Sequence, residues 1–211
     1  MTVASPSISQ YLLESKAVKL EPSKPFTWAS GWKSPIYCDN RITLSFPNIR
    51  TAIRDAFVEK IKQHYPQVEV IAGVATGAIA QGALVAEAMQ LPFIYVRSAP
   101  KKHGMENLIE GIVHPGQKVV VIEDLVSTGG SSLQAVEALR KAEAEVLGMV
   151  AIFTYGFPYA EENFKAGHCK LVTLTNYMEL LDLASASGYI KADQIDVLKQ
   201  WRQNPGIWMQ G

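Results

Sequence analysis

Two adjacent acids followed by a loop of hydroxyl and glycine residues are the most chemically distinctive feature of the sequence. Glu123 and Asp124 come directly after an apolar run at 119–122, and the loop 127–132 reads S-T-G-G-S-S. Glycines let a backbone approach a ligand closely, and hydroxyl groups donate hydrogen bonds. A helix that begins just after such a loop adds unpaired N–H groups and the positive end of its dipole. The loop therefore predicts a phosphate site.

The two acids cannot bind the same anion as the loop, because like charges repel. Carboxylates at the end of a strand can instead accept hydrogen bonds from a diol such as ribose. A phosphate site beside a diol site indicates a ribose 5-phosphate group as the ligand. The alternative is a strand that ends in a capped loop with solvated acids, and the long, ordered combination of strand, acids, loop and helix disfavours it.

The elements that must position these groups are those of a doubly wound α/β sheet. An apolar run such as 119–122 is typical of a parallel strand covered on both faces, and ligands bind such sheets at the carboxyl ends of the strands. A second strand–loop–helix unit begins at Val68 and ends near Met89. The same patterns predict further strands at 93–98, 146–155 and 171–174, a short hairpin within 26–44, and helices at 47–64, 133–144, 176–186 and 192–202.

Length, charge and cysteine content limit the class of protein. The 211 residues suit a single domain, 1–211, and 20 basic residues balance 20 acidic ones. This balance favours neither nucleic acid nor an anionic membrane as a partner. No signal peptide or membrane-spanning run is recognised. Cys38 and Cys169 lack disulfide or metal-site spacing, so we expect reduced thiols in a cytoplasmic protein.

The stretch from 118 to 132 resembles the phosphoribosyl pyrophosphate signature of the type I phosphoribosyltransferases. In that signature an apolar strand, two acids and two apolar residues lead into a Ser/Thr-Gly loop. Neither G-x-x-x-x-G-K-[ST] nor a G-x-G-x-x-G after this strand is present. The resemblance implies that the donor is bound by Glu123, Asp124, Leu125, Val126, Ser127, Thr128, Gly129, Gly130 and Ser131.

Two further segments resemble the orotate phosphoribosyltransferases within that family. S-G-x-x-S-P-x-Y-x-D-x-R at 30–41 is similar to their N-terminal hood, and R-x-x-x-K-x-H-G at 97–104 is similar to their flexible catalytic loop. The hood would comprise mainly residues 1–45, with the C-terminal helices packing on it. The resemblance implies orotate contacts from Ile36, Tyr37 and Ser127, and donor contacts from Arg97, Lys101, His103 and the pyrophosphate loop at Ala75 and Thr76.

The implied reaction transfers the 5-phosphoribosyl group from phosphoribosyl pyrophosphate to orotate in de novo pyrimidine (UMP) biosynthesis. Its products are orotidine 5'-monophosphate and pyrophosphate. The resemblance implies Lys101, His103 and Asp124 as catalytic residues and a homodimer in which the loop 99–111 completes the neighbouring site. Mg²⁺ is the expected cofactor, because this hard cation bridges phosphate oxygens, and no residue is predicted as its direct ligand.

The sequence departs from the family at several cationic positions. Ala29, Gly77 and Ser98 or Ala99 stand where some members carry lysine, and no arginine occurs at 152–155, where some place one near the orotate carboxylate. Two alternatives share the 118–132 stretch. A purine or uracil phosphoribosyltransferase is disfavoured by the hood and loop motifs. A regulator that senses phosphoribosyl pyrophosphate would normally carry a basic DNA-binding segment, which the neutral charge disfavours.

Overall fold

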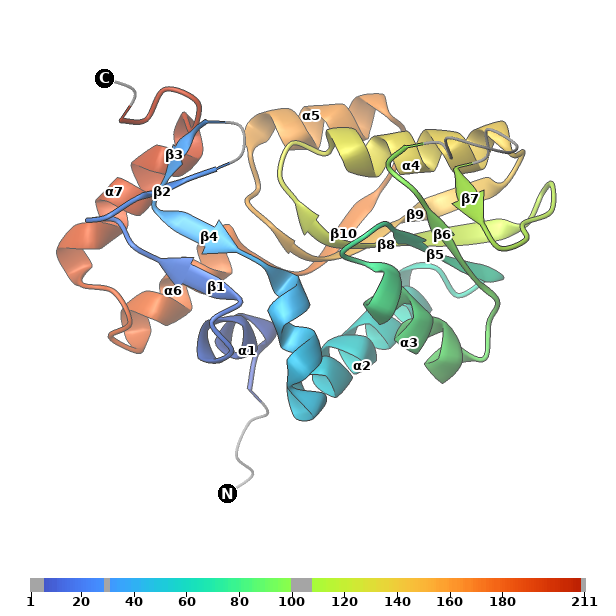
Figure 1. Ribbon diagram of the computed structural model, residues 1–211, viewed down its shortest axis with the longest axis horizontal. Coiled ribbons are helices and arrows are strands. Elements are labelled where there is room, and N and C mark those ends of the chain that lie inside the picture. The colour runs from blue at the N-terminus through green and yellow to red at the C-terminus, as the bar shows by residue number, and fades with distance from the viewer. Residues whose placement is uncertain (1–5, 29–30, 100–107, 210–211) are drawn as a thin grey trace.

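The computed structural model describes residues 6–28, 31–99 and 108–209. Its main body is a six-stranded sheet in the order β10-β9-β8-β5-β6-β7, in which all pairs are parallel except the antiparallel pair β6 and β7 (Figure 1). The predicted doubly wound α/β architecture is confirmed. The strands are β5 (Val70–Val74), β6 (Phe93–Val96), β7 (Ile109–Glu110), β8 (Lys118–Val126), β9 (Glu145–Thr154) and β10 (Leu171–Asn176).

Helices cover both faces of the sheet, as the uninterrupted apolar strands require. Along β8, Val119 and Val121 pack toward α4 (Gly130–Lys141), whereas Val120 and Ile122 pack in the core that contains α2 (Pro47–His64) and α3 (Ile79–Met89). The shorter helix α5 (Pro158–Ala166) lies beside α4 (Figure 1). Successive β8 residues therefore face different layers, which decides where the two acids point.

Helix α2 matches the predicted bounds at both ends. Pro47 occupies its first turn, where a missing N–H costs nothing, and Ile49, Ile53, Phe57 and Ile61 recur at intervals of four and are all buried. The helix thereby anchors the sheet face on which the N-terminal segment also lies.

A second, smaller unit lies beside the carboxyl ends of the strands and forms the hood (Figure 1). Trp201 of its last helix is fully buried, packs edge-on against Trp28 and Tyr155, and donates an Nε1–H hydrogen bond to the Lys33 carbonyl at 3.2 Å. The last helix is therefore packed against the N-terminal segment that contains Trp28 and Lys33. The elements of the hood are α1 (Ile8–Glu14), β1 (Val18–Leu20), β2 (Phe26–Thr27), β3 (Lys33–Ser34), β4 (Ile36–Cys38), the 3-10 helix η1 (Asn40–Ser45), α6 (Tyr177–Ala186) and α7 (Ala192–Gln203).

Several predicted boundaries are wrong. Strand β8 does not end before the acids but continues to Val126, because its hydrogen-bond ladder with β9 persists through Leu125 and Val126. Helix α4 begins at Gly130 rather than near 133. Within the segment 26–44, β2 and β3 form the predicted hairpin, and Pro35 separates β3 from β4, which pairs with β1 instead. Helix α5 and strand β7 were not predicted, since both are short and weakly patterned.

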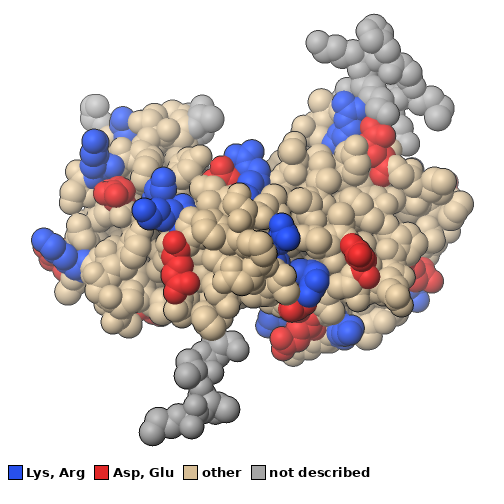
Figure 2. All heavy atoms as spheres, turned by 60° about the horizontal axis from the view of Figure 1, so that its bottom comes forward, with Lys and Arg blue, Asp and Glu red and all other residues tan. Residues whose placement is uncertain are grey.

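The surface is consistent with the neutral composition. Basic and acidic side chains are interspersed over the face in Figure 2, without a large field of either sign. Within the described part of the chain, no helix combines the length and apolarity needed to cross a bilayer.

Candidate active site

The two acids of β8 point to different layers of the protein. Glu123 is only 4% exposed, and its Oε2 accepts a hydrogen bond from the Ser132 hydroxyl at 2.7 Å. Its Oε1 accepts one from the Asp124 backbone N–H at 2.9 Å. Asp124, one residue further along the strand, is partly exposed and lies on the side of α3 and the hood. Glu123 is therefore held inside the protein, and Asp124 is the acid available to a ligand.

Burial also determines the protonation of Glu123. Loss of solvent raises its pKa from 4.5 to about 8, and the negative charge of Asp124 adds to the rise, whereas the Ser132 hydrogen bond opposes it. Burial therefore favours the protonated form of Glu123.

Two neighbours fix Asp124. The side-chain amide of Asn40, which is 2% exposed, donates to the Asp124 carbonyl at 2.5 Å and so connects η1 to β8. Strand β5 ends at Val74, and its ladder with β8 reaches only Ile122. The Asp124 carbonyl therefore has no partner in β5 and can accept the hydrogen bond from the Asn40 amide. On the other side, a Cβ atom at Gly77 would overlap the Asp124 carboxylate. The absence of a side chain at Gly77 therefore makes room for the acid.

The loop between β8 and α4 leads directly into the helix as predicted, but it offers fewer free hydroxyl groups than predicted. Gly129 caps α4 in the left-handed conformation, with φ +83°, and a Cβ there would lie 2.8 Å from the Phe164 ring. Thr128 and Ser131 are exposed beside the helix N-terminus. The prediction that Ser132 contributes to the phosphate loop is wrong, because its hydroxyl is buried against Glu123.

Two cavities meet at this edge of the sheet. The first, which we call the acid cavity, has a volume of about 400 Å³, and the second, the aromatic cavity, about 260 Å³. Cys38 and Leu125 line both, so the two cavities share a wall. The acid cavity is also lined by Asp39, Arg41, Val74, Ala75, Thr76, Gly77, Glu123, Asp124 and Ser131, and the aromatic cavity by Thr27, Trp28, Tyr37, Ser127 and Tyr155.

Most predicted site residues lie at these cavities. Ala75, Thr76, Glu123, Asp124 and Ser131 line the acid cavity, Tyr37 and Ser127 line the aromatic cavity, and Leu125 lines both. Thr128, Gly129 and Gly130 form the adjoining loop. The remaining predicted residues lie elsewhere or are not described.

Ile36 and Val126 are fully buried and line neither cavity. The Ile36 carbonyl accepts hydrogen bonds from Trp28 and Ser34, so Tyr37 is the member of the predicted pair that reaches the aromatic cavity. Arg97 follows β6 at the same sheet edge, where its guanidinium approaches Glu110 at 3.4 Å. Lys101 and His103 lie outside the described residues.

Several residues at the site were not predicted. The rule that ligands bind at the carboxyl ends of strands, applied to β9, would have indicated Tyr155. Trp28 lies beside the hood motif, Cys38 and Asn40 occupy positions that the motif leaves open, and Arg41 is its last specified residue, to which no role was assigned. Their roles depend on contacts between segments far apart in the sequence.

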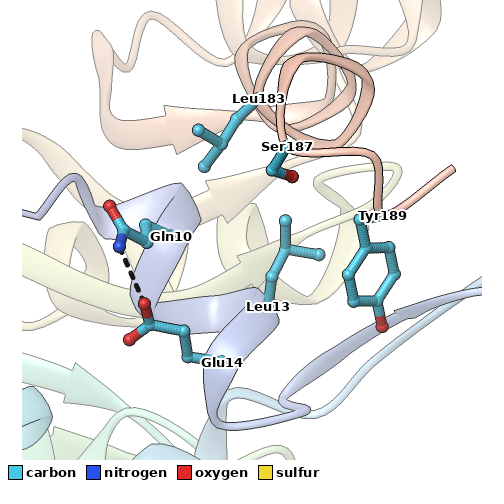
Figure 3. A pocket seen from close by; sticks show the side chains of 6 residues that line it. All are labelled: Gln10, Leu13, Glu14, Leu183, Ser187 and Tyr189. Atoms are coloured by element: carbon cyan, nitrogen blue, oxygen red, sulfur yellow. Dashed lines mark hydrogen bonds between the residues drawn. The ribbon is translucent and has the colours of Figure 1, made fainter.

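A further cavity, of about 320 Å³, lies between α1 and α6, away from these strand ends (Figure 3). Its lining is mainly apolar, and its hydrogen bond between Gln10 and Glu14 joins two residues of the same helix. A specific small-molecule site normally brings polar groups from different elements together. The acid and aromatic cavities meet this criterion and form the candidate active site.

Comparisons with known proteins point to one family. A family model described as the phosphoribosyl transferase domain matches residues 43–177. A protein of Porphyromonas gingivalis named orotate phosphoribosyltransferase is 59% identical over 201 residues, which cover 95% of this chain and 96% of that protein. One of the same name from Streptococcus thermophilus is 57% identical over 208 residues, covering 99% of each.

Solved structures agree. Orotate phosphoribosyltransferase from Aeropyrum pernix is 26% identical with a TM-score of 0.73, over 87% of this chain and 99% of that chain. UMP synthase of Leishmania donovani is 28% identical with a TM-score of 0.77, over 92% of this chain and 41% of that longer chain.

The raised pKa of Glu123 gives a testable pH dependence. The folded state keeps a proton that the unfolded chain releases above about pH 4.5, so this group's contribution to stability is lost as pH rises toward 8. The glutamine of Glu123→Gln does not titrate. Between pH 6 and pH 9 the free energy of unfolding of wild type should therefore fall by on the order of 2 kcal/mol relative to that of the variant. Urea denaturation at both pH values measures the difference.

Glu59→Gln, which removes an exposed carboxyl group on α2, serves as the control. An equal difference between wild type and Glu123→Gln at pH 6 and pH 9 would contradict a protonated Glu123.

Proposed function

The chain belongs to the phosphoribosyl transferase family, and from this membership and the site geometry we propose how its residues carry out the reaction of an orotate phosphoribosyltransferase. The reaction transfers the 5-phosphoribosyl group of phosphoribosyl pyrophosphate to orotate and releases pyrophosphate, in pyrimidine biosynthesis. The observation that carries the proposal is the shared wall of the two cavities. It brings a site suited to a phosphorylated sugar against one suited to a planar ring.

The acid cavity binds the donor. Asp124 accepts hydrogen bonds from the ribose hydroxyls, and the loop 127–131, with the N-terminus of α4, binds the 5-phosphate. The turn that contains Ala75 and Thr76 lines the same cavity and receives the diphosphate through its backbone. Because burial raises the pKa of Glu123, the acid pair adds less negative charge to the cavity than two exposed carboxylates would.

The aromatic cavity binds orotate. Trp28, Tyr37 and Tyr155 supply ring surfaces, and a volume of about 260 Å³ suits a single small heterocycle. Ser127 contributes a hydroxyl at the side nearest the phosphate loop. In this proposal the nitrogen nucleophile of the base faces the shared wall and the sugar.

Displacement of pyrophosphate at C1 develops positive charge on the ribose ring. The Asp124 carboxylate, fixed by the Asn40 contact to its carbonyl and by the lack of a side chain at Gly77, stabilises that charge without having to reorganise. The hood excludes water, which would otherwise hydrolyse the cationic sugar. Cations on the 99–111 loop, Lys101 and His103, stabilise the departing diphosphate, and a protonated His103 shares its proton with it.

Mg²⁺ is proposed as the cofactor. The acid cavity offers hard oxygen donors from Asp124 and Ser131, which suit this cation. Within the described residues, no group of three or more His, Cys, Asp or Glu side chains could hold a metal ion. The residues therefore fit an ion that arrives with the donor phosphates, where it would neutralise diphosphate charge.

Two further proposals concern assembly and location. The protein acts as a homodimer whose 99–111 loop covers the neighbouring site, since a loop that must close and reopen can serve an adjacent subunit. Free thiols at Cys38 and Cys169 fit a reducing compartment such as the cytoplasm.

The reaction itself is tested by the loss of orotate absorbance after addition of phosphoribosyl pyrophosphate and Mg²⁺. Uracil, adenine and hypoxanthine serve as control acceptors and should not react comparably. Asp124→Asn keeps the size of the side chain but removes its charge, so turnover should fall by about a hundredfold. Glu69→Gln, which removes a carboxylate at the opposite end of β8, is the matched control. Wild-type turnover in Asp124→Asn would reject the role of this acid.

Gly77→Ala tests whether the position of Asp124 matters. The added methyl group must displace the carboxylate, so turnover should drop by about tenfold or more while the protein stays folded. Stopped assays measure turnover, and circular dichroism checks the fold. A folded Gly77→Ala enzyme with unchanged turnover would show that the contact between Gly77 and Asp124 has no catalytic consequence.

Subunit complementation tests the shared site. A Lys101→Ala protein mixed with an Asp124→Asn protein should recover activity after subunit exchange, because a mixed dimer then has one site with both groups intact. If each subunit used its own loop, every site would carry one lesion. No recovery, with exchange verified by mass spectrometry, would reject the loop in trans.

A further inference from the structure

Arg41 provides a cation at the acid cavity that no sequence motif assigned to the donor. It lies in the first turn of η1 and lines the cavity together with the turn 75–77, Asp124 and Ser131. The other charged side chains that line this cavity are the carboxyl groups of Asp39, Glu123 and Asp124. Within the described lining, Arg41 is thus the one positively charged group.

The guanidinium is held in one orientation. Its Nε donates to Asp39 Oδ1 at 2.7 Å, and its Nη2 donates to Asp39 Oδ2 at 2.9 Å. This two-pronged pair leaves the Nη1 group without a hydrogen bond to any described residue, and the side chain is 59% exposed. An arginine whose position is fixed but whose remaining donors are free is suited to bind a phosphate.

A role in stability alone does not account for this arrangement. Asp39 already caps η1 by accepting from the backbone N–H of Arg41, a contact that any residue other than proline would make at position 41. An exposed ion pair adds little to the stability of a fold. The placement of the guanidinium beside a cavity rich in carboxyl groups is therefore better explained by an anionic ligand.

We propose that Arg41, oriented by Asp39, binds the diphosphate group of the donor and of the product pyrophosphate. This inference rests on the proposed function. A diphosphate at the turn 75–77 would otherwise meet Asp39 and Asp124 with no fixed cation among the described residues of the cavity, and repulsion would weaken its binding. Arg41 offsets that repulsion from within the described lining of the cavity.

The test compares Arg41→Gln and Arg41→Lys with Arg54→Gln. Arg54 forms a similar pair with its neighbour Asp55 at 2.7 Å on α2 and lines neither cavity, so it is a matched control. Isothermal titration with magnesium pyrophosphate measures binding without turnover, and steady-state kinetics give separate KM values for donor and orotate. Circular dichroism sets a temperature at which all variants are folded.

Arg41→Gln should raise both the Kd for pyrophosphate and the KM for the donor by about tenfold, with little change in the KM for orotate. Arg41→Lys should give a smaller loss, because it keeps the charge but not the fixed fork. Arg54→Gln should match wild type. Unchanged pyrophosphate binding in Arg41→Gln, or an effect on the KM for orotate alone, would overturn the proposal.

The proposed function and this inference can fail separately. If wild type bound magnesium pyrophosphate but transferred no phosphoribosyl group to orotate, the reaction assignment would be lost. The pyrophosphate titrations of the Arg41 variants would still decide whether this arginine binds the diphosphate.

Discussion

Two carboxyl groups at consecutive positions of one strand cannot both be ionised and both serve a ligand without strong repulsion. The alternation of a β-strand resolves this conflict, because it sends Glu123 into the layer of α4 and leaves Asp124 on the ligand side. Burial raises the pKa of Glu123 and favours its protonated form, and the Ser132 hydroxyl donates a hydrogen bond to its Oε2. The remaining acid then carries the charge of the pair, and the strand fixes its direction.

The surrounding elements are arranged around that single acid. Strand β5 stops at Val74, which leaves the Asp124 carbonyl to be bound by Asn40, and the turn after β5 carries glycine at the point where a side chain would collide with the carboxylate. The aromatic cavity depends on more distant segments. Trp201, near the end of the chain, packs against Trp28 and Tyr155, which line it. The stability of the C-terminal helix is thus connected to the shape of the base site.

Much of the fold could be predicted from local sequence. Helix α2 has a proline at its start and an isoleucine or phenylalanine at every fourth position, and the apolar run before Glu123 indicates a parallel strand. The end of β8 could not be located, because the ladder with β9 is a contact between distant segments that offsets the low strand propensity of the acids. Short elements such as β7 and α5 carry too few residues for a pattern to show.

The site was predictable in its parts but not in its geometry. The acids and the glycine loop were recognised from their order, yet their different orientations depend on a hydroxyl nine residues away. Only the pairing of β4 with β1 shows that Tyr37, and not the buried Ile36, faces the aromatic cavity. Asn40 occupies a position that the hood motif leaves open, and Arg41, which the motif specifies, was assigned no role, since both act through contacts between the hood and the sheet or cavity that no local pattern records.

The wall formed by Cys38 and Leu125 has a consequence for ligand design. Since the same two side chains border both cavities, a molecule that joins a planar acceptor mimic to a phosphorylated sugar mimic through a short linker can occupy both at once. Once one half is bound, the other half is confined near its own cavity at a high effective concentration, about millimolar or above for a short linker. Such a tethered inhibitor would gain avidity from proximity alone. Its selectivity would depend on the distance between the two cavities across the Cys38 and Leu125 side chains.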